Sequence, residues 1–281
     1  MMATSGPFTT IPMPAMLRAT RRFGSLVRRS PGHEGLKVTN GIAWQKHTPK
    51  VVSPQSVPLL LIHGFGCGRD DWGALTHIVA SKSKREVISF DNRGIGSSDA
   101  SKGPYTVEMM AADALSVIEA ASFQKVDVLG ISLGGMIAQE FALKYPERTN
   151  GLVLGCTTHG GRHATPVPDS FISICAAFAG ADDPNTSPVV DDFLAQSLPA
   201  DCSRSAFFEK LKSRFSQTPR TARGLQGQLG AMSRFNVASQ LGTLTCPTLV
   251  VAGMRRGSLT NALARTQSPG TLADAVRFSG R

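Results

Sequence analysis

The sequence Gly130-Ile131-Ser132-Leu133-Gly134 stands between an expected strand at residues 126–129 and a helical pattern at residues 134–145 that ends before Pro146. A G-x-S-x-G sequence that follows a strand and opens a helix predicts a sharp turn with the serine at its tip. The serine backbone on such a turn is strained by about 1–3 kcal/mol, and a Cβ at either glycine would clash across the turn. Free N–H groups at the start of the helix, with the positive end of its dipole, favour a developing oxyanion nearby. The stretch therefore predicts an α/β fold and a nucleophile at Ser132.

Outward from this turn, apolar runs alternate with helical patterns. Asn40-Gly41, between the first two runs, is a strong β-hairpin signal. Strands that alternate with helices predict a mostly parallel, doubly wound sheet with helices on both faces. The expected strands are residues 36–39, 42–45, 59–62, 86–90, 126–129, 152–154 and 248–252, and the expected core helices are residues 71–80, 107–121 and 134–145.

The chain divides into five segments by pattern. Its 281 residues suit one α/β core with an inserted subdomain. Residues 160–235 show helical stretches at 171–179, 190–197 and 206–215 without an intervening strand, which predicts a helical cap. The expected segments are a basic leader at 1–33, the core at 34–159 and 236–253, the cap at 160–235, and an atypical basic tail at 254–281.

Positive charge is concentrated at the two ends of the chain. The net charge is +10, yet residues 34–253 carry 20 basic and 19 acidic side chains. A nucleic-acid-binding face on the body is therefore not expected. The longest nearly apolar run, residues 171–179, is about half of what a membrane span requires. The five cysteines have no metal-ligand spacing, which favours buried thiols in a reducing compartment.

The leader has the composition of an organellar transit peptide. Residues 1–33 hold five arginines, seven serines or threonines and no acid, and they lack the apolar run of a secretory signal. We expect mitochondrial targeting. The alternative is a disordered basic tail on a cytoplasmic protein.

Two further motifs end earlier strands. His63-Gly64-Phe65-Gly66 lies 69 residues before Ser132, and Asp91-Asn92-Arg93-Gly94-Ile95-Gly96-Ser97-Ser98 begins 41 residues before it. Together with the serine turn, over residues 36–253, these motifs resemble the α/β-hydrolase fold family, and most of all its esterase, lactonase and cofactor-free haloperoxidase-like members. The resemblance implies that the Phe65 and Leu133 N–H groups form an oxyanion hole and that Gly64, Gly130 and Gly134 shape it. It also implies that Asp91 and Arg93 brace loops and do not react.

The resemblance also exposes a gap. Members of the family place an acid after the next-to-last strand and a histidine after the last one. Here residues 248–252 are followed by Gly253-Met254-Arg255-Arg256, the only later acid is Asp274, and no histidine follows His163. We therefore expect the final strand and helix to be missing, which leaves the nucleophile without its usual base.

Other candidate residues have an ordinary interpretation beside the functional one. His159 follows the expected strand at 152–154 and is either a substitute base or a loop histidine at the cap entrance. His63 is expected to be structural, and Cys67 to be a packed thiol. Aromatic residues of the cap line an acyl or ring pocket or simply form core: Phe171, Phe178, Phe193, Phe207, Phe208 and Phe215.

The sequence thus predicts a serine hydrolase lineage that acts on small-molecule carboxylic esters or lactones through an acyl-enzyme at Ser132. Removal of the general base lowers turnover by on the order of 10⁶ in such enzymes, so weak activity or none is expected. The alternative is a non-catalytic ligand binder or an inactive isoform. No cofactor, metal, nucleic acid or membrane span is expected.

Overall fold

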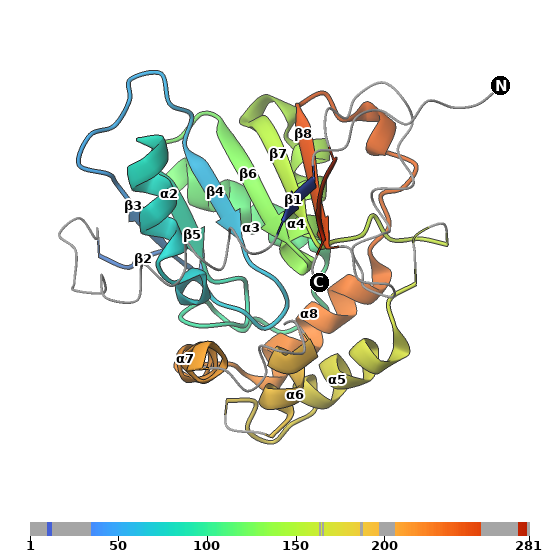
Figure 1. Cartoon of the computed structure of the whole chain (residues 1–281). Helices are drawn as coiled ribbons and strands as arrows, with labels where there is room; N and C mark the ends of the chain where they lie inside the picture. Colours follow the sequence, from blue (N-terminus) through green and yellow to red (C-terminus); the bar gives the residue numbers. More distant parts are fainter. Residues whose placement is uncertain are drawn as a thin grey trace.

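The computed structural model of the chain describes residues 10–12, 35–162, 164, 166–185, 188–196, 206–253 and 275–279. Nine strands in these residues form one sheet in the order β1-β9-β8-β7-β6-β4-β5-β3-β2 (Figure 1). Neighbours from β1 to β5 run parallel, whereas β3 and β2 are antiparallel. The mostly parallel sheet is therefore confirmed. The strands are β1 Thr10–Pro12, β2 Lys37–Thr39, β3 Ile42–His47, β4 Leu59–Ile62, β5 Val87–Phe90, β6 Val126–Ile131, β7 Thr149–Gly155, β8 Thr248–Gly253 and β9 Ala275–Ser279.

One edge of the sheet differs from the expectation. β9 pairs with β8, and β1 pairs with β9 in turn. The expectation that no strand follows Gly253 is therefore wrong, and residues 10–12 of the expected leader also form a strand. Both segments are short, and pairing with a distant strand, which local sequence does not encode, stabilises them. The rest of both end segments, including the place of a final helix, lies outside the described residues.

Helices cover both faces of the sheet. In Figure 1, α2 lies in front of the sheet, and α3 and α4 lie side by side behind it. Their bounds are α2 Leu75–Ser83, α3 Val107–Ala120 and α4 Leu133–Lys144, with short 3-10 turns η1 Arg69–Trp72, η2 Pro146–Arg148 and η3 Leu241–Thr243.

The helix expected at residues 71–80 is broken in two. Gly73, with φ of +58°, ends η1 before α2 begins at Leu75. A Cβ on Gly73 would lie 2.0 Å from the guanidinium of Arg214, so this position also brings a cap helix close to the core. The left-handed backbone that glycine permits explains why one continuous helix does not form.

Four helices follow β7 and precede β8 along the chain. They lie at the end of the sheet where the parallel strands finish (Figure 1). They are α5 Asp169–Ala179, α6 Val189–Gln196, α7 Ala206–Phe215 and α8 Ala222–Arg234. No helix is expected from the sequence of α8, because its three glycines lower helix propensity. One of these glycines, Gly224, packs closely against Gly94. A Cβ added to Gly94 would lie only 2.4 Å from the Cα of Gly224. The close approach of these two backbones seats α8 on the loop after β5.

Every helix in the described residues is too short or too polar to cross a lipid bilayer.

Candidate active site

Ser132 occupies the tip of a sharp turn between β6 and α4. Its backbone has φ of 55° and ψ of −120°, a conformation that side-chain-bearing residues rarely adopt. The Ser132 N–H donates to the carbonyl of Gly155 at 2.9 Å, and its carbonyl accepts from Thr157 Oγ1 at 2.7 Å. Strand β7 and the loop after it therefore hold the strained residue on both sides, as strain at a functional position requires.

The glycines of the turn are required by space. A Cβ on Gly130 would lie 2.1 Å from the carbonyl oxygen of Gly134, and a Cβ on Gly134 would lie 2.0 Å from the carbonyl oxygen of Ile62. Gly135, which the sequence analysis did not single out, is equally confined, because its Cβ would lie 2.5 Å from Thr157. The close approach of α4 to β4 and β7 is thus possible only with glycine at these positions.

The loop after β4 lies against Ser132. A Cβ on Gly64 would stand 3.3 Å from Ser132 Cβ and 3.8 Å from Ser132 Oγ. Leu133 is the first residue of α4, so its N–H has no acceptor within the helix. In the described part of the chain, no hydrogen-bond acceptor contacts the N–H of Phe65. Two unpaired backbone donors thus flank the serine, from the loop after β4 and from the start of α4.

His63 is built into the loop as a structural residue. Its Nδ1 accepts from the Gly64 N–H at 2.8 Å, and its carbonyl accepts from Asn92 Nδ2 at 3.0 Å. Its ring packs on Trp72 with centroids 4.4 Å apart. Burial, together with the positive charge of Arg220, lowers the pKa of His63 to about 4. The imidazole is therefore neutral near pH 7, and Nδ1 is already used as an acceptor.

Asp91 and Arg93 brace loops beside the site. The Asp91 carboxylate is buried, accepts from the Arg69 and Ser97 backbone N–H groups at 2.7 and 2.9 Å, and forms an ion pair with Arg69. Burial raises the pKa of this carboxyl, and the Arg69 charge opposes that shift. Arg93 makes a two-point ion pair with Asp113 of α3 at 2.6 and 2.7 Å.

A cavity of about 500 Å³ opens beside Ser132, between the core and the cap. Ser132, Met136 and Thr157 line its floor from the core, and α5 and α8 contribute mostly apolar side chains. Of the six cap phenylalanines that the sequence assigns either to a pocket or to the core, Phe171 lines this cavity. Phe178, Phe193, Phe208 and Phe215 are buried in the core and Phe207 is exposed. The larger apolar residues that line the cavity from the cap include Val167, Phe171, Ile172, Leu229, Met232 and Phe235.

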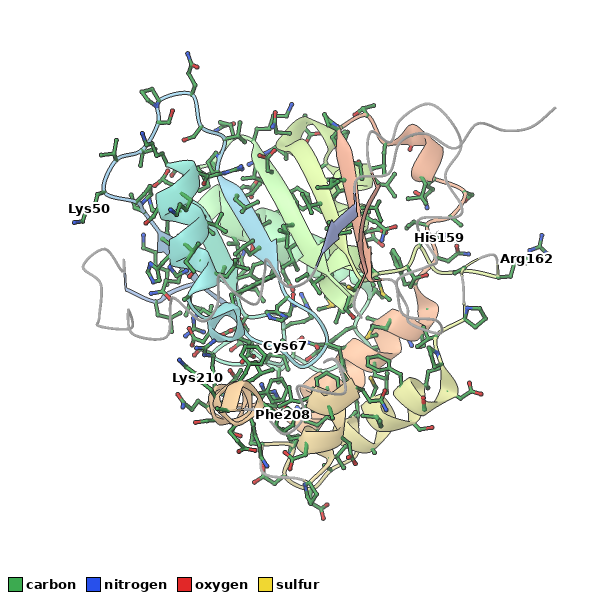
Figure 2. All side chains as sticks on the ribbon, viewed as in Figure 1. Lys50, Cys67, His159, Arg162, Phe208 and Lys210 are labelled. Carbon is green, nitrogen blue, oxygen red and sulfur yellow. The ribbon has the colours of Figure 1, made fainter. Side chains whose placement is uncertain are left out.

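No histidine in the described residues hydrogen-bonds to Ser132. His159 is 2% exposed and is not among the residues that line the cavity. Its Nδ1 lies 2.7 Å from the Gly160 carbonyl, and its buried Nε2 has no partner. In Figure 2, His159 lies at the side of the sheet, well away from Cys67 in the loop after β4. The structure thus does not bring His159 together with Ser132, and His163 lies outside the described residues.

Cys67 is half-buried and packs against the hydrophobic core, and burial raises the pKa of its thiol well above the usual range. In the part of the chain that the structure describes, no group of three or more His, Cys, Asp or Glu side chains is arranged to hold a metal ion.

Two buried cap side chains that were not expected at the site contact the loop after β4. Gln228 of α8 and Arg220 of the α7–α8 connection both hydrogen-bond to Gly66. Nothing local in the sequence signals them, because they lie 162 and 154 residues from their partner.

Comparisons with known proteins agree with the observed fold. A poly(3-hydroxyalkanoate) depolymerase from Ectopseudomonas oleovorans is 36% identical over 107 residues, which are 38% of this chain and 37% of the depolymerase. The 3-oxoadipate enol-lactonase 2 from Acinetobacter baylyi is 26% identical over 69% of this chain and 70% of the lactonase. The structure of a thermophilic esterase from Thermogutta terrifontis matches with a TM-score of 0.66 and 23% identity, over 88% of each chain. The sequence model of the alpha/beta hydrolase fold matches residues 57–256, which is most of the chain. The chain therefore belongs to the α/β-hydrolase fold family.

Proposed function

We propose that this chain carries the active site of a serine hydrolase for carboxylic esters or lactones, with Ser132 as the nucleophile. The observation that carries the proposal is the strained backbone of Ser132, a residue that lines a cavity and lies next to the β4 loop and at the start of α4. Strain of this kind is retained where function needs it. The names of the relatives, an ester-polymer depolymerase, an enol-lactonase and an esterase, support the same substrate class.

The chemistry follows from the arrangement. Ser132 Oγ forms a bond to the carbonyl carbon, and the π electron pair moves onto the carbonyl oxygen, where the Phe65 and Leu133 N–H groups stabilise it. Collapse of this intermediate breaks the bond to the leaving oxygen, which takes up a proton and departs as an alcohol. Water then attacks the acyl-serine, and the acid leaves with Ser132 restored.

The rate of this reaction in the present chain depends on where the serine proton goes. In enzymes of this type a histidine accepts it, and His63 and His159 are both held elsewhere by other contacts. We therefore expect slow turnover. The oxyanion donors and the cavity alone leave a residual acceleration of roughly 10³–10⁴ over water in serine hydrolases that have lost their triad.

Labelling with a fluorophosphonate probe tests the nucleophile. We expect slow labelling that maps to Ser132 by mass spectrometry and is absent in Ser132→Ala. Ser233→Ala is the matched control, because Ser233 lines the same cavity from α8 and its Oγ donates to the Gly230 carbonyl. Labelling that persists in Ser132→Ala would remove the assignment.

Imidazole rescue tests the missing base. Imidazole added at millimolar concentration should raise hydrolysis of p-nitrophenyl butyrate by the wild-type chain above the rate with Ser132→Ala. The variant corrects for direct attack of imidazole on the ester. Fast hydrolysis without imidazole would show that a residue of the chain already acts as base, and His159→Gln would then identify or exclude His159.

A second candidate function is ligand binding without turnover. A cavity next to a serine that has no histidine partner among the described residues favours it. An ester analogue that raises the melting temperature of Ser132→Ala and of wild type equally, with no labelling of either, would support this candidate over the first.

A further inference from the structure

The loop that carries Phe65 is held from two sides at the next residue, Gly66. The Gly66 N–H donates to Gln228 Oε1 at 3.0 Å, and the Gly66 carbonyl accepts from Arg220 Nε at 2.5 Å. Both side chains are buried, with Gln228 at 0% and Arg220 at 3% exposure. Both belong to the cap segment, so the cap satisfies both backbone polar groups of one residue in a core loop.

We propose that Gln228 and Arg220 are positioning residues that orient the Phe65 N–H toward Ser132. This inference rests on the proposed function, because it needs Ser132 to react. It assigns to the cap a part in shaping the oxyanion hole, in addition to covering the cavity.

The geometry of the turn connects Gly66 to the Phe65 N–H. The Cys67 N–H donates to the Gly64 carbonyl at 3.2 Å, so residues 64–67 form a tight turn with Phe65 and Gly66 at its centre. In a planar trans peptide the C=O and N–H point in opposite directions. The bond to the Gly64 carbonyl therefore directs the Phe65 N–H out of the turn, while Gln228 and Arg220 fix the following residue.

Gly66 can be held this way because it has no side chain. Its φ is +69°, and a Cβ there would lie 2.8 Å from the ring of Phe178 in α5. Without fixed partners a glycine samples other backbone conformations readily. Two hydrogen bonds from buried side chains remove that freedom at the residue beside the proposed donor.

The Gln228 amide serves a second loop with its other end. Its Nε2 donates to the Arg93 carbonyl at 3.0 Å, in the loop after β5. One amide orientation satisfies both bonds, since the acceptor faces an N–H and the donor faces a C=O. The Gly224–Gly94 contact brings α8 close enough for this bridge.

Arg220 is tied to its surroundings as firmly. Its Nη1 donates to the carbonyls of Phe215 and Thr218 at 2.5 and 2.6 Å, its guanidinium lies 3.5 Å from the Phe215 ring centroid, and its Nη2 lies 3.5 Å from Asp71 Oδ2. A side chain with this many partners has one position, so its contact to Gly66 is preorganised.

The test compares Gln228→Met with Gln226→Met in the full chain. Both changes replace an amide of α8 with an apolar side chain of similar length. Among the described residues, however, the hydrogen bond of Gln226 Nε2 stays within the cap and goes to the Ala179 carbonyl at 3.2 Å. Fluorophosphonate labelling of Ser132 is followed at several probe concentrations to separate the binding constant KI from the maximal rate kinact. We expect Gln228→Met to lower kinact about 10- to 100-fold with KI unchanged, because deletion of one oxyanion donor costs about 10²–10³-fold. Gln226→Met should label like wild type.

A second pair keeps the proposal testable if Gln228→Met does not fold. Arg220→Lys retains a charge near Asp71 but cannot make the donor set to Gly66, Phe215 and Thr218. Arg85→Lys is its control, because the Arg85–Asp127 ion pair at 2.5 Å lies at the opposite end of β6 from Ser132. We expect kinact to fall in Arg220→Lys and to stay unchanged in Arg85→Lys.

Hydrogen–deuterium exchange over residues 61–70 gives the structural readout. Faster exchange in the Gln228 and Arg220 variants than in their controls, together with the fall in kinact, supports the proposal. A folded Gln228→Met or Arg220→Lys that labels at the wild-type kinact overturns it. A wild-type chain that is not labelled at Ser132 instead defeats the proposed function, so the two failures are distinguishable.

Discussion

Gly64 lies beside Ser132 with no room for a side chain between them: a Cβ on Gly64 would stand 3.3 Å from the Cβ and 3.8 Å from the Oγ of the serine. The two residues lie on separate loops, after β4 and after β6, and neighbouring parallel strands bring them together. The distance between the serine oxygen and the backbone donors of the β4 loop is therefore set by the absence of a side chain at residue 64.

Gly64→Ala should reduce the reactivity of Ser132. The added methyl would also lie 3.4 Å from the Ile131 carbonyl, so the loop or the serine must shift by a few tenths of an ångström. We expect labelling to slow about 10-fold, since small displacements of reacting groups are costly, and stability to fall by about 1 kcal/mol. Gly242→Ala is the control, because no atom lies within 4 Å of its added Cβ. Unchanged labelling in a folded Gly64→Ala would contradict this tight spacing.

Gly134→Ala should destabilise the fold itself. Its Cβ would overlap two backbone carbonyls, those of Ile62 and His63, at 2.0 and 2.7 Å. Backbone cannot move aside as a flexible side chain can, so we expect a loss of about 3 kcal/mol or more in urea unfolding. Gly230→Ala meets only the end of the Arg234 side chain at 3.3 Å and should be neutral or slightly stabilising. Equal stability of the two variants would argue against the clash.

The strain at Ser132 predicts a reversal of the usual alanine–glycine order. With φ of 55° and ψ of −120°, glycine fits the position better than any residue with a Cβ. Ser132→Gly should therefore be more stable than Ser132→Ala by about 1 kcal/mol. Ser116 lies inside helix α3, where alanine is favoured over glycine, so Ser116→Ala should be more stable than Ser116→Gly by a similar amount. Thermal unfolding of the four variants measures both differences, and the same order at both sites would rule out backbone strain.

His63 should make stability fall on acidification. Its folded-state pKa of about 4 lies below the unfolded value of 6.5, so only the unfolded chain takes up this proton between those pH values. Asp71 opposes the effect, because burial raises its pKa from 3.8 to about 6 and the folded chain binds that proton first.

The variant His63→Asn separates the two groups. The stability advantage of wild type over His63→Asn should shrink by about 2 kcal/mol between pH 7 and pH 5. Urea titrations at the two pH values measure it, with His77→Asn as the comparison. A difference that does not change with pH would mean that His63 titrates normally in the folded chain.

Residues 1–33 are proposed to direct the chain to mitochondria, from five arginines and no acid. A fusion of residues 1–40 to a fluorescent protein should co-localise with a mitochondrial marker, and exchange of the five arginines for glutamine should abolish this. A diffuse cytosolic signal with an intact N-terminus by mass spectrometry would favour the cytoplasmic alternative.

Local chemistry was enough to predict much of the fold and the sharp turn that carries Ser132. The Asn40-Gly41 turn joins β2 and β3 as expected, with φ of 49° and 75°, because few dipeptides adopt that turn at low cost. The apolar run of β4 is buried throughout, as a central parallel strand requires. The requirement for glycine at position 130 arises within the turn, because a Cβ there would meet the Gly134 carbonyl, whereas the requirement at Gly134 comes from the Ile62 and His63 carbonyls beside it.

Tertiary structure decided what depends on distant partners. The break at Gly73 and the glycine-containing helix α8 exist because Arg214 and Gly94 approach them from other parts of the chain. β9 forms because β8 offers it a ladder of backbone groups, whatever the local propensity of residues 275–279. The hydrogen bond from the Gly66 N–H to Gln228 joins residues that are 162 positions apart in the sequence. Hydrophobic period and turn chemistry operate over a few residues, whereas close backbone packing and buried hydrogen bonds are settled only when the elements meet.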